Sequence, residues 1–134
     1  MKSTKWSPPP AGKYKLNVDA AFIPETGVGG IGAVVRNDNG EVMAAMALPL
    51  ARVVNDVKKD EEESWASDGH LIGDIKRSLQ HFEDVIISYS PRGANQVAHF
   101  LAKHALNCNT MVTWIEEVPF WLESIVNDDM VVSS

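Results

Sequence analysis

Apolar and polar residues alternate along the first part of the chain with a period of two. Residues 14–22 read YKLNVDAAF, in which one set of alternate positions is apolar and the other is mainly polar. The apolar set is Tyr14, Leu16, Val18, Ala20 and Phe22. The opposite set is Lys13, Lys15, Asn17, Asp19 and Ala21. This alternation predicts a half-buried strand with Asp19 near its middle, on the face opposite the apolar set.

Two more strand-like runs follow, at residues 28–37 and 41–50, after a turn at PETG. The dipeptide Asn39-Gly40 lies between them and is a strong signal for a two-residue hairpin. The first third of the chain therefore predicts a three-stranded antiparallel meander.

The pattern changes after residue 54. Residues 55–69 are charged and aperiodic, which is typical of a loop or a frayed helix. Residues 70–82 carry apolar side chains at helical spacing, residues 84–90 resemble a short buried strand, and residues 94–108 predict a second helix. The rest of the chain is acidic and predicts irregular structure with at most a short amphipathic turn.

The predicted organisation is a single domain, because 134 residues are enough for one hydrophobic core. We expect a Pro-rich lead-in at 1–12, the domain at 13–108 and an acidic tail at 109–134. No apolar run reaches the roughly 18 residues of a membrane span, and the first residues lack the apolar stretch of a secretory signal. With a single cysteine, Cys108, these features predict a cytoplasmic or nuclear protein that is not secreted and has no membrane partner.

Charge is distributed unevenly along the chain. The net charge is −6, which argues against non-specific nucleic-acid binding. Residues 1–54 carry six basic and four acidic side chains, whereas residues 55–134 carry six basic and fourteen acidic side chains. A basic surface is therefore possible only on the first part, and solvated acidic helix faces with an acidic tail are the favoured explanation of the imbalance.

Three further patterns have structural explanations. Gly27, Gly29 and Gly32 match a dinucleotide-binding spacing but run into a strand rather than a helix, so close packing or a bulge is favoured. His99 and His104 are five residues apart and share no helix face well, which argues against zinc. Cys108 is expected to act as a small buried hydrophobe.

The position of Asp19 in the middle of a predicted strand raises the question of whether this residue has a function. A carboxylate in the middle of a covered strand is costly unless it is paired or bound to a ligand. Antiparallel meanders often keep one face in water, however, and this explains Asp19 equally well. Position alone leaves the two interpretations open.

Four stretches together resemble one family, the ribonuclease H-like domain of plant proteins derived from reverse transcriptases. WSPPPAGKYKLNVDAAF resembles its first strand with the preceding Trp and prolines, and GVGGIGAVVRNDNGEVMAA resembles its second and third strands. YSPRGANQVAHFLAKHAL resembles its last strand and helix, and WIEEVPFWL its usual tail. The resemblance implies an α/β fold with a mixed sheet: an antiparallel meander, parallel strands and helices.

The resemblance also implies a chemistry, the cleavage of the RNA strand of RNA–DNA hybrids by two Mg²⁺ ions held by carboxylates. Asp19 matches the family's first metal ligand, and His99 matches its fourth catalytic position. The family's helix Glu and the Asp that ends its fourth strand have no match. The basic and amide side chains expected to contact nucleic acid are Lys13, Lys15, Arg36, Arg92 and Asn95.

The missing carboxylates indicate an internal deletion of about one helix–strand unit, on the order of 30 residues. Without its fourth strand the sheet would have a gap of about 10 Å beside the first strand. Either residues 84–90 pair directly with the first strand or an exposed edge remains, and we expect direct pairing. The acidic residues of 56–63 lie in a predicted loop, which is a poor support for a metal cluster.

Two functions follow from these residues. One is a Mg²⁺-dependent ribonuclease H-like hydrolase, whose catalysis is expected to be impaired and whose Mg²⁺ binding is expected to be weak. The other is a non-catalytic remnant that binds nucleic acid, or a protein at an open sheet edge. The number of carboxylates on the active face separates the two, and only Asp19 can be placed there.

Overall fold

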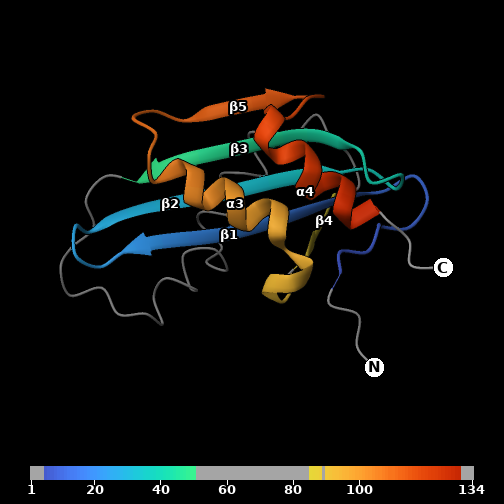
Figure 1. Cartoon of the computed structure of the whole chain (residues 1–134). Helices are drawn as coiled ribbons and strands as arrows, with labels where there is room; N and C mark the ends of the chain where they lie inside the picture. The colour runs from blue at the N-terminus through green and yellow to red at the C-terminus, as the bar shows by residue number, and fades with distance from the viewer. Residues whose placement is uncertain (1–4, 51–84, 89, 131–134) are drawn as a thin grey trace.

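The computed structural model describes residues 5–50, 85–88 and 90–130. Its strands are β1 (Tyr14–Ile23), β2 (Val28–Arg36), β3 (Val42–Leu50), β4 (Val85–Ser88) and β5 (Val112–Ile115). Its helices are the 3-10 turn η1 (Arg92–Ala94), α3 (Gln96–Ala105) and α4 (Phe120–Met130). The strands form one mixed sheet in the order β4-β1-β2-β3-β5, and α3 and α4 lie on one face of it (Figure 1). This arrangement is consistent with a ribonuclease H-like α/β fold.

The predicted meander is confirmed. β1 pairs antiparallel with β2, from Lys15 opposite Arg36 to Ile23 opposite Val28. β2 in turn pairs antiparallel with β3. At the turn between β2 and β3, Gly40 has a φ of 82° and donates its N–H to the carbonyl of Asn37. A positive φ favours glycine. The turn is longer than the predicted two-residue hairpin, because Asn37 donates its N–H to the carbonyl of Glu41 and three residues lie between them.

The direct pairing of the last predicted strand with the first is also confirmed. β4 runs parallel to β1, with Tyr14 opposite Val85 and Asn17 opposite Ser88. β4 is thus the end strand of the sheet as far as the structure describes it.

The two faces of β1 separate apolar from polar side chains as the alternation predicted. Leu16 and Ala20 belong to a buried apolar cluster with Ile31, Ala33 and Val35 of β2. Asn17 and Asp19 point to the opposite side of the sheet, where α3 lies. A second apolar cluster lies on that side, between the sheet and the helices. Its buried members are Val34, Val42, Ala45, Val97, Ala98, Leu101, Leu122 and Val126.

Glycines in β2 let α3 approach the sheet closely. A Cβ at Gly32 would overlap the carbonyl oxygen of Ala98 and the amide nitrogen of Ala102. A Cβ at Gly30 would come within 2.6 Å of the Ala102 carbonyl oxygen. The glycine-rich run therefore serves packing, which was the favoured explanation from the sequence.

The expectation of an irregular C-terminal stretch is wrong. Residues 112–115 form β5, which pairs antiparallel with β3, and residues 120–130 form α4. These two elements were not predicted because the stretch is rich in acidic residues and its two amphipathic patterns are short. Leu122 and Val126 are four residues apart and face the core, while Glu123 and Asp128 are exposed on the other side of α4.

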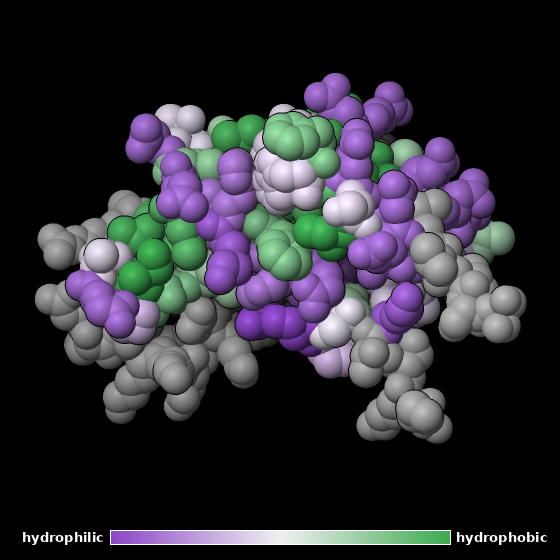
Figure 2. All heavy atoms as spheres, viewed as in Figure 1, coloured by the Kyte–Doolittle hydropathy of each residue, from purple (hydrophilic) through white to green (hydrophobic). Residues whose placement is uncertain are grey.

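The predicted loop at 55–69 and the predicted helix at 70–82 lie outside the described residues. Within the described part of the chain, no helix is long and apolar enough to cross a membrane. The face that carries α3 and α4 presents many hydrophilic side chains, with apolar ones between them (Figure 2).

Candidate functional site

Asp19 lies on β1 under the start of α3 and contacts two nitrogen-bearing side chains. Its Oδ2 is 3.1 Å from Nδ1 of His99 on α3 and 3.6 Å from Nη2 of Arg92 on η1. The side chains of Asp19 and His99 are 19% and 17% exposed, whereas that of Arg92 is 61% exposed. A carboxylate oxygen accepts, so the contact is a hydrogen bond in the tautomer of His99 that carries its proton on Nδ1. A half-buried carboxylate is thus held beside an exposed guanidinium.

The close approach of α3 to β2 accounts for the Asp19–His99 contact. Gly32 is the register partner of Asp19, and Ala98, which sits directly over Gly32, precedes His99 in the helix. Because Gly32 has no side chain, α3 lies low enough for His99 to reach across to β1.

Asn95 fixes the junction between η1 and α3. Its Nδ2 donates to the carbonyl of Val18, one residue before Asp19, over 3.0 Å. Its backbone has a φ of −133°, which separates η1 from α3, so the helix predicted to start at residue 94 starts at Gln96. Asn95 is 7% exposed and acts as an anchor for the Arg92 turn, rather than as a surface contact.

The described residues do not fit a two-metal site. Mg²⁺ clusters need several carboxylate oxygens around one point. Among residues 5–50, 85–88 and 90–130, no three His, Cys, Asp or Glu side chains come together in a way that could hold a metal ion. Asp19 instead lies beside the guanidinium of Arg92, whose Nη2 is 3.6 Å from its Oδ2.

Arg36 was predicted to contact nucleic acid, but it lies in the interior. It is 0% exposed, its Nη1 donates to Oδ2 of Asp129 on α4 over 2.8 Å, and its Nε donates to the carbonyl of Gly40. Burial lowers the pKa of Arg36, and the hydrogen bond and charge of Asp129 act in the opposite direction. In this position its guanidinium cannot reach a phosphate at the surface.

The two lysines predicted for the same role lie near the start of β1. Lys13 is exposed, whereas Lys15 is half-buried and donates from Nζ to the carbonyl of Ser7 over 2.8 Å. Burial, and secondly the charge of Arg36, lower the pKa of Lys15. The structure therefore gathers Asp19, Arg92 and His99 in one place, and Lys15 and Arg36 in another.

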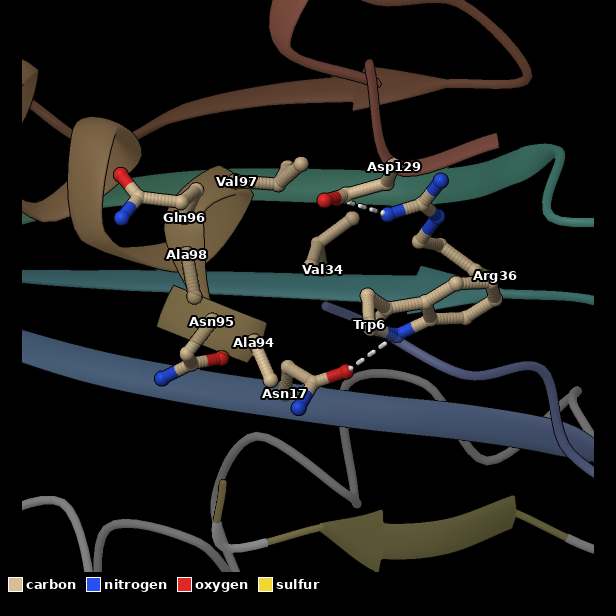
Figure 3. Close-up of a pocket in the computed structure, with 10 residues that line it drawn as sticks. All are labelled: Trp6, Asn17, Val34, Arg36, Ala94, Asn95, Gln96, Val97, Ala98 and Asp129. Atoms are coloured by element: carbon tan, nitrogen blue, oxygen red, sulfur yellow. Dashed lines mark hydrogen bonds and ion pairs between the residues drawn. The ribbon is translucent and has the colours of Figure 1, made fainter. Parts of the chain in front are cut away.

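Sequence reasoning did not single out Trp6, Asn17 or Asp129, which surround Arg36. The centroid of the Trp6 ring is 3.9 Å from Cζ of Arg36, and the Trp6 indole donates to Oδ1 of Asn17 over 3.0 Å (Figure 3). Asn17 is two residues from Asp19 on the same face of β1, and that spacing is the one sequence signal that could have drawn attention to it.

The chain was compared with known families, curated proteins and solved structures. The family model described as reverse transcriptase-like matches residues 50–105, which is less than half of the chain. The matched stretch runs from the end of β3 to the end of α3 and contains Arg92, Asn95 and His99 but not Asp19. No curated protein and no solved structure matches the chain. Over residues 50–105 the chain is thus similar to the reverse transcriptase-like family.

Proposed function

We propose that this chain is a ribonuclease H-like domain that binds RNA–DNA hybrids without cleaving them, in the cytoplasm or nucleus. The observation that carries the proposal is the pairing of Asp19 with Arg92 and His99. In the family that the chain resembles, the carboxylate of the first strand binds Mg²⁺ together with other carboxylates. Here the guanidinium of Arg92 lies beside that carboxylate, and among the described residues no group of three His, Cys, Asp or Glu side chains could hold a metal ion.

Arg92 is the group that suits a phosphate. Its side chain is 61% exposed, and a guanidinium presents several donors in a planar fork that matches two phosphate oxygens. Asp19 lies 3.6 Å from one edge of the fork, so the side chain starts from a preferred position. Less conformational entropy is then lost when a phosphate binds.

The overall charge limits where a polyanion can approach. The net charge is −6, and Glu123 and Asp128 are exposed on α4. We infer that a hybrid contacts the Arg92 side of the sheet and stays away from α4. Binding through so few cations should be weak and should fall steeply with salt.

The test is the affinity for a fluorescein-labelled RNA–DNA hybrid, measured by anisotropy at low salt in EDTA and again in Mg²⁺. Arg92→Gln should weaken binding about tenfold and reduce the salt dependence by about one ion, because one phosphate contact is lost. Lys103→Gln is the matched control, since it removes one exposed positive charge near the other end of α3. Equal losses in the two variants, or no binding by the wild type, would contradict the proposal.

A protein partner at the sheet edge is the second candidate. β4 ends the described sheet, has four residues and carries Ile86, which is 41% exposed. An end strand with an exposed apolar side chain can accept a strand from another chain. Ile86→Lys should block such pairing and leave the affinity for the hybrid unchanged, so the two candidates can be told apart.

A further inference from the structure

We propose that Trp6 is a positioning residue for the site formed by Asp19, Arg92 and His99, so that the Pro-rich lead-in is a working part of the domain. The inference rests on the proposed function, because its consequence is a change in hybrid affinity. It also makes a structural prediction that can be tested without any ligand.

A buried polar contact links the lead-in to β1. Trp6 is 8% exposed, and its Nε1 donates to Oδ1 of Asn17 over 3.0 Å. Asn17 is 1% exposed, so the indole supplies its carbonyl oxygen with a partner where water has little access. An unpaired amide at such a depth is costly, and the contact therefore fixes the orientation of the Asn17 side chain.

The fixed orientation of the Asn17 side chain in turn affects the turn that contains Arg92. With its oxygen held by Trp6, its Nδ2 points to Oγ of Ser90, 3.5 Å away. Oγ of Ser90 also lies 2.8 Å from Oγ of Ser88 at the end of β4. Ser90 is therefore held between β1 and β4, and only Pro91 separates it from Arg92.

Packing supplies a second connection between Trp6 and the same turn. The Trp6 ring, Asn17, Ala94 and Asn95 line one narrow hollow together with Arg36 and Asp129 (Figure 3). The hollow has no room for a water molecule. Loss of the ring would open this space beside η1 and let water compete for the amides of Asn17 and Asn95, which hold the turn to β1.

The indole is held firmly enough to act as a support. Its ring packs on the guanidinium of Arg36 at 3.9 Å, and Arg36 is bound to Asp129 of α4. Lys15 adds a hydrogen bond to the carbonyl of Ser7 in the lead-in. The start of the described chain is thus fixed to the sheet and to α4 before it reaches Asn17.

The test uses Trp6→Phe in the full chain, which keeps an aromatic ring over Arg36 but removes the indole N–H and makes the side chain smaller. Trp6→Phe should weaken hybrid binding about three- to tenfold, the range expected for one buried hydrogen bond. Trp114→Phe, a half-buried tryptophan on β5, is the control and should bind as the wild type does. Equal effects of the two substitutions would overturn the proposal.

Variants of Ser90 provide the second part of the binding experiment. Ser90→Ala should weaken binding as Trp6→Phe does, and Ser90→Thr, which keeps a hydroxyl, should restore most of the affinity. The double variant Trp6→Phe/Ser90→Ala should lose little more than either single variant, because both act through one chain of contacts. Additive losses, or wild-type binding by Ser90→Ala, would show that Trp6 does not act through the turn.

NMR of the free protein separates failure of this inference from failure of the proposed function. In Trp6→Phe, the side-chain amide of Asn17 and the backbone amides of Ser90 and Arg92 should shift, with no such shifts in Trp114→Phe. Those shifts would support the positioning role even if the wild type bound no hybrid. Shifts confined to residues 5–12 would overturn it, whatever the chain binds.

Discussion

Asp19 and His99 are 80 residues apart in the sequence, and their side chains lie 3.1 Å apart across the interface between β1 and α3. The contact depends on how deeply α3 sits on the sheet, which Gly32 controls. Arg92, at 3.6 Å from the same carboxylate oxygen, completes a group of three side chains.

Gly32→Ala should destabilise the protein and separate Asp19 from His99. A methyl group at this position would overlap backbone atoms of Ala98 and Ala102, which cannot rotate away. We expect a loss of about 1–3 kcal/mol in the free energy of unfolding, measured by urea denaturation. The ring signals of His99 should change as well.

Gly12→Ala is the comparison for that experiment. Gly12 has open space around its Cβ position but a φ of 78°. Its substitution should therefore cost only the dihedral strain, about 1 kcal/mol, and leave the His99 signals unchanged. If Gly32→Ala were as stable as the wild type, the close packing of α3 on β2 would be wrong.

The Arg36–Asp129 pair should behave as a buried ion pair. Asp129→Asn leaves the buried charge of Arg36 without its counter-ion, so the free energy of unfolding should fall by about 3 kcal/mol. The double variant Arg36→Met/Asp129→Leu should lose less than the sum of its single variants, since apolar groups then replace both charges. Asp128→Asn, at an exposed neighbouring position, is the control and should be nearly neutral. A neutral Asp129→Asn would mean that α4 does not depend on this pair.

Asp19→Asn should change stability little and should not alter the response to Mg²⁺. The amide keeps an oxygen for His99, and the contact with exposed Arg92 is screened by solvent, so a change of no more than about 1 kcal/mol is expected. A metal bound at Asp19 would raise the melting temperature with increasing Mg²⁺. A Mg²⁺-dependent stabilisation of the wild type that is absent in Asp19→Asn but present in Asp38→Asn would contradict the account.

The strands near the start of the chain were predictable because a period of two is a local property of the sequence. The direct pairing of β4 with β1 was predictable too, although it needed the family resemblance and the spacing of strands. α4 and β5 were not predicted because the sequence around them is acidic and their amphipathic patterns are short. The pattern of α4 is the four-residue spacing of Leu122 and Val126. Local composition does not reveal which side of a short helix meets the core.

The site was predictable only in part. Asp19 was singled out by its position on β1. His99 was identified only through the family resemblance, because the sequence around a helical histidine does not indicate which distant residue it contacts. Arg36 could not be recognised as buried, since its environment comes from Trp6 and Asp129 at opposite ends of the chain. An arginine on the polar face of a predicted strand is normally expected at the surface.

The most direct measurement is cleavage of a labelled RNA–DNA hybrid in Mg²⁺ and in Mn²⁺ by the wild type and by Asp19→Asn, purified in parallel. Host ribonuclease H is a common contaminant, and the variant reveals it because contaminating activity does not depend on Asp19. The account predicts binding of the hybrid with the same, background level of cleavage in both preparations. Cleavage by the wild type that Asp19→Asn abolishes would show that an active metal site forms around Asp19, and would contradict the account.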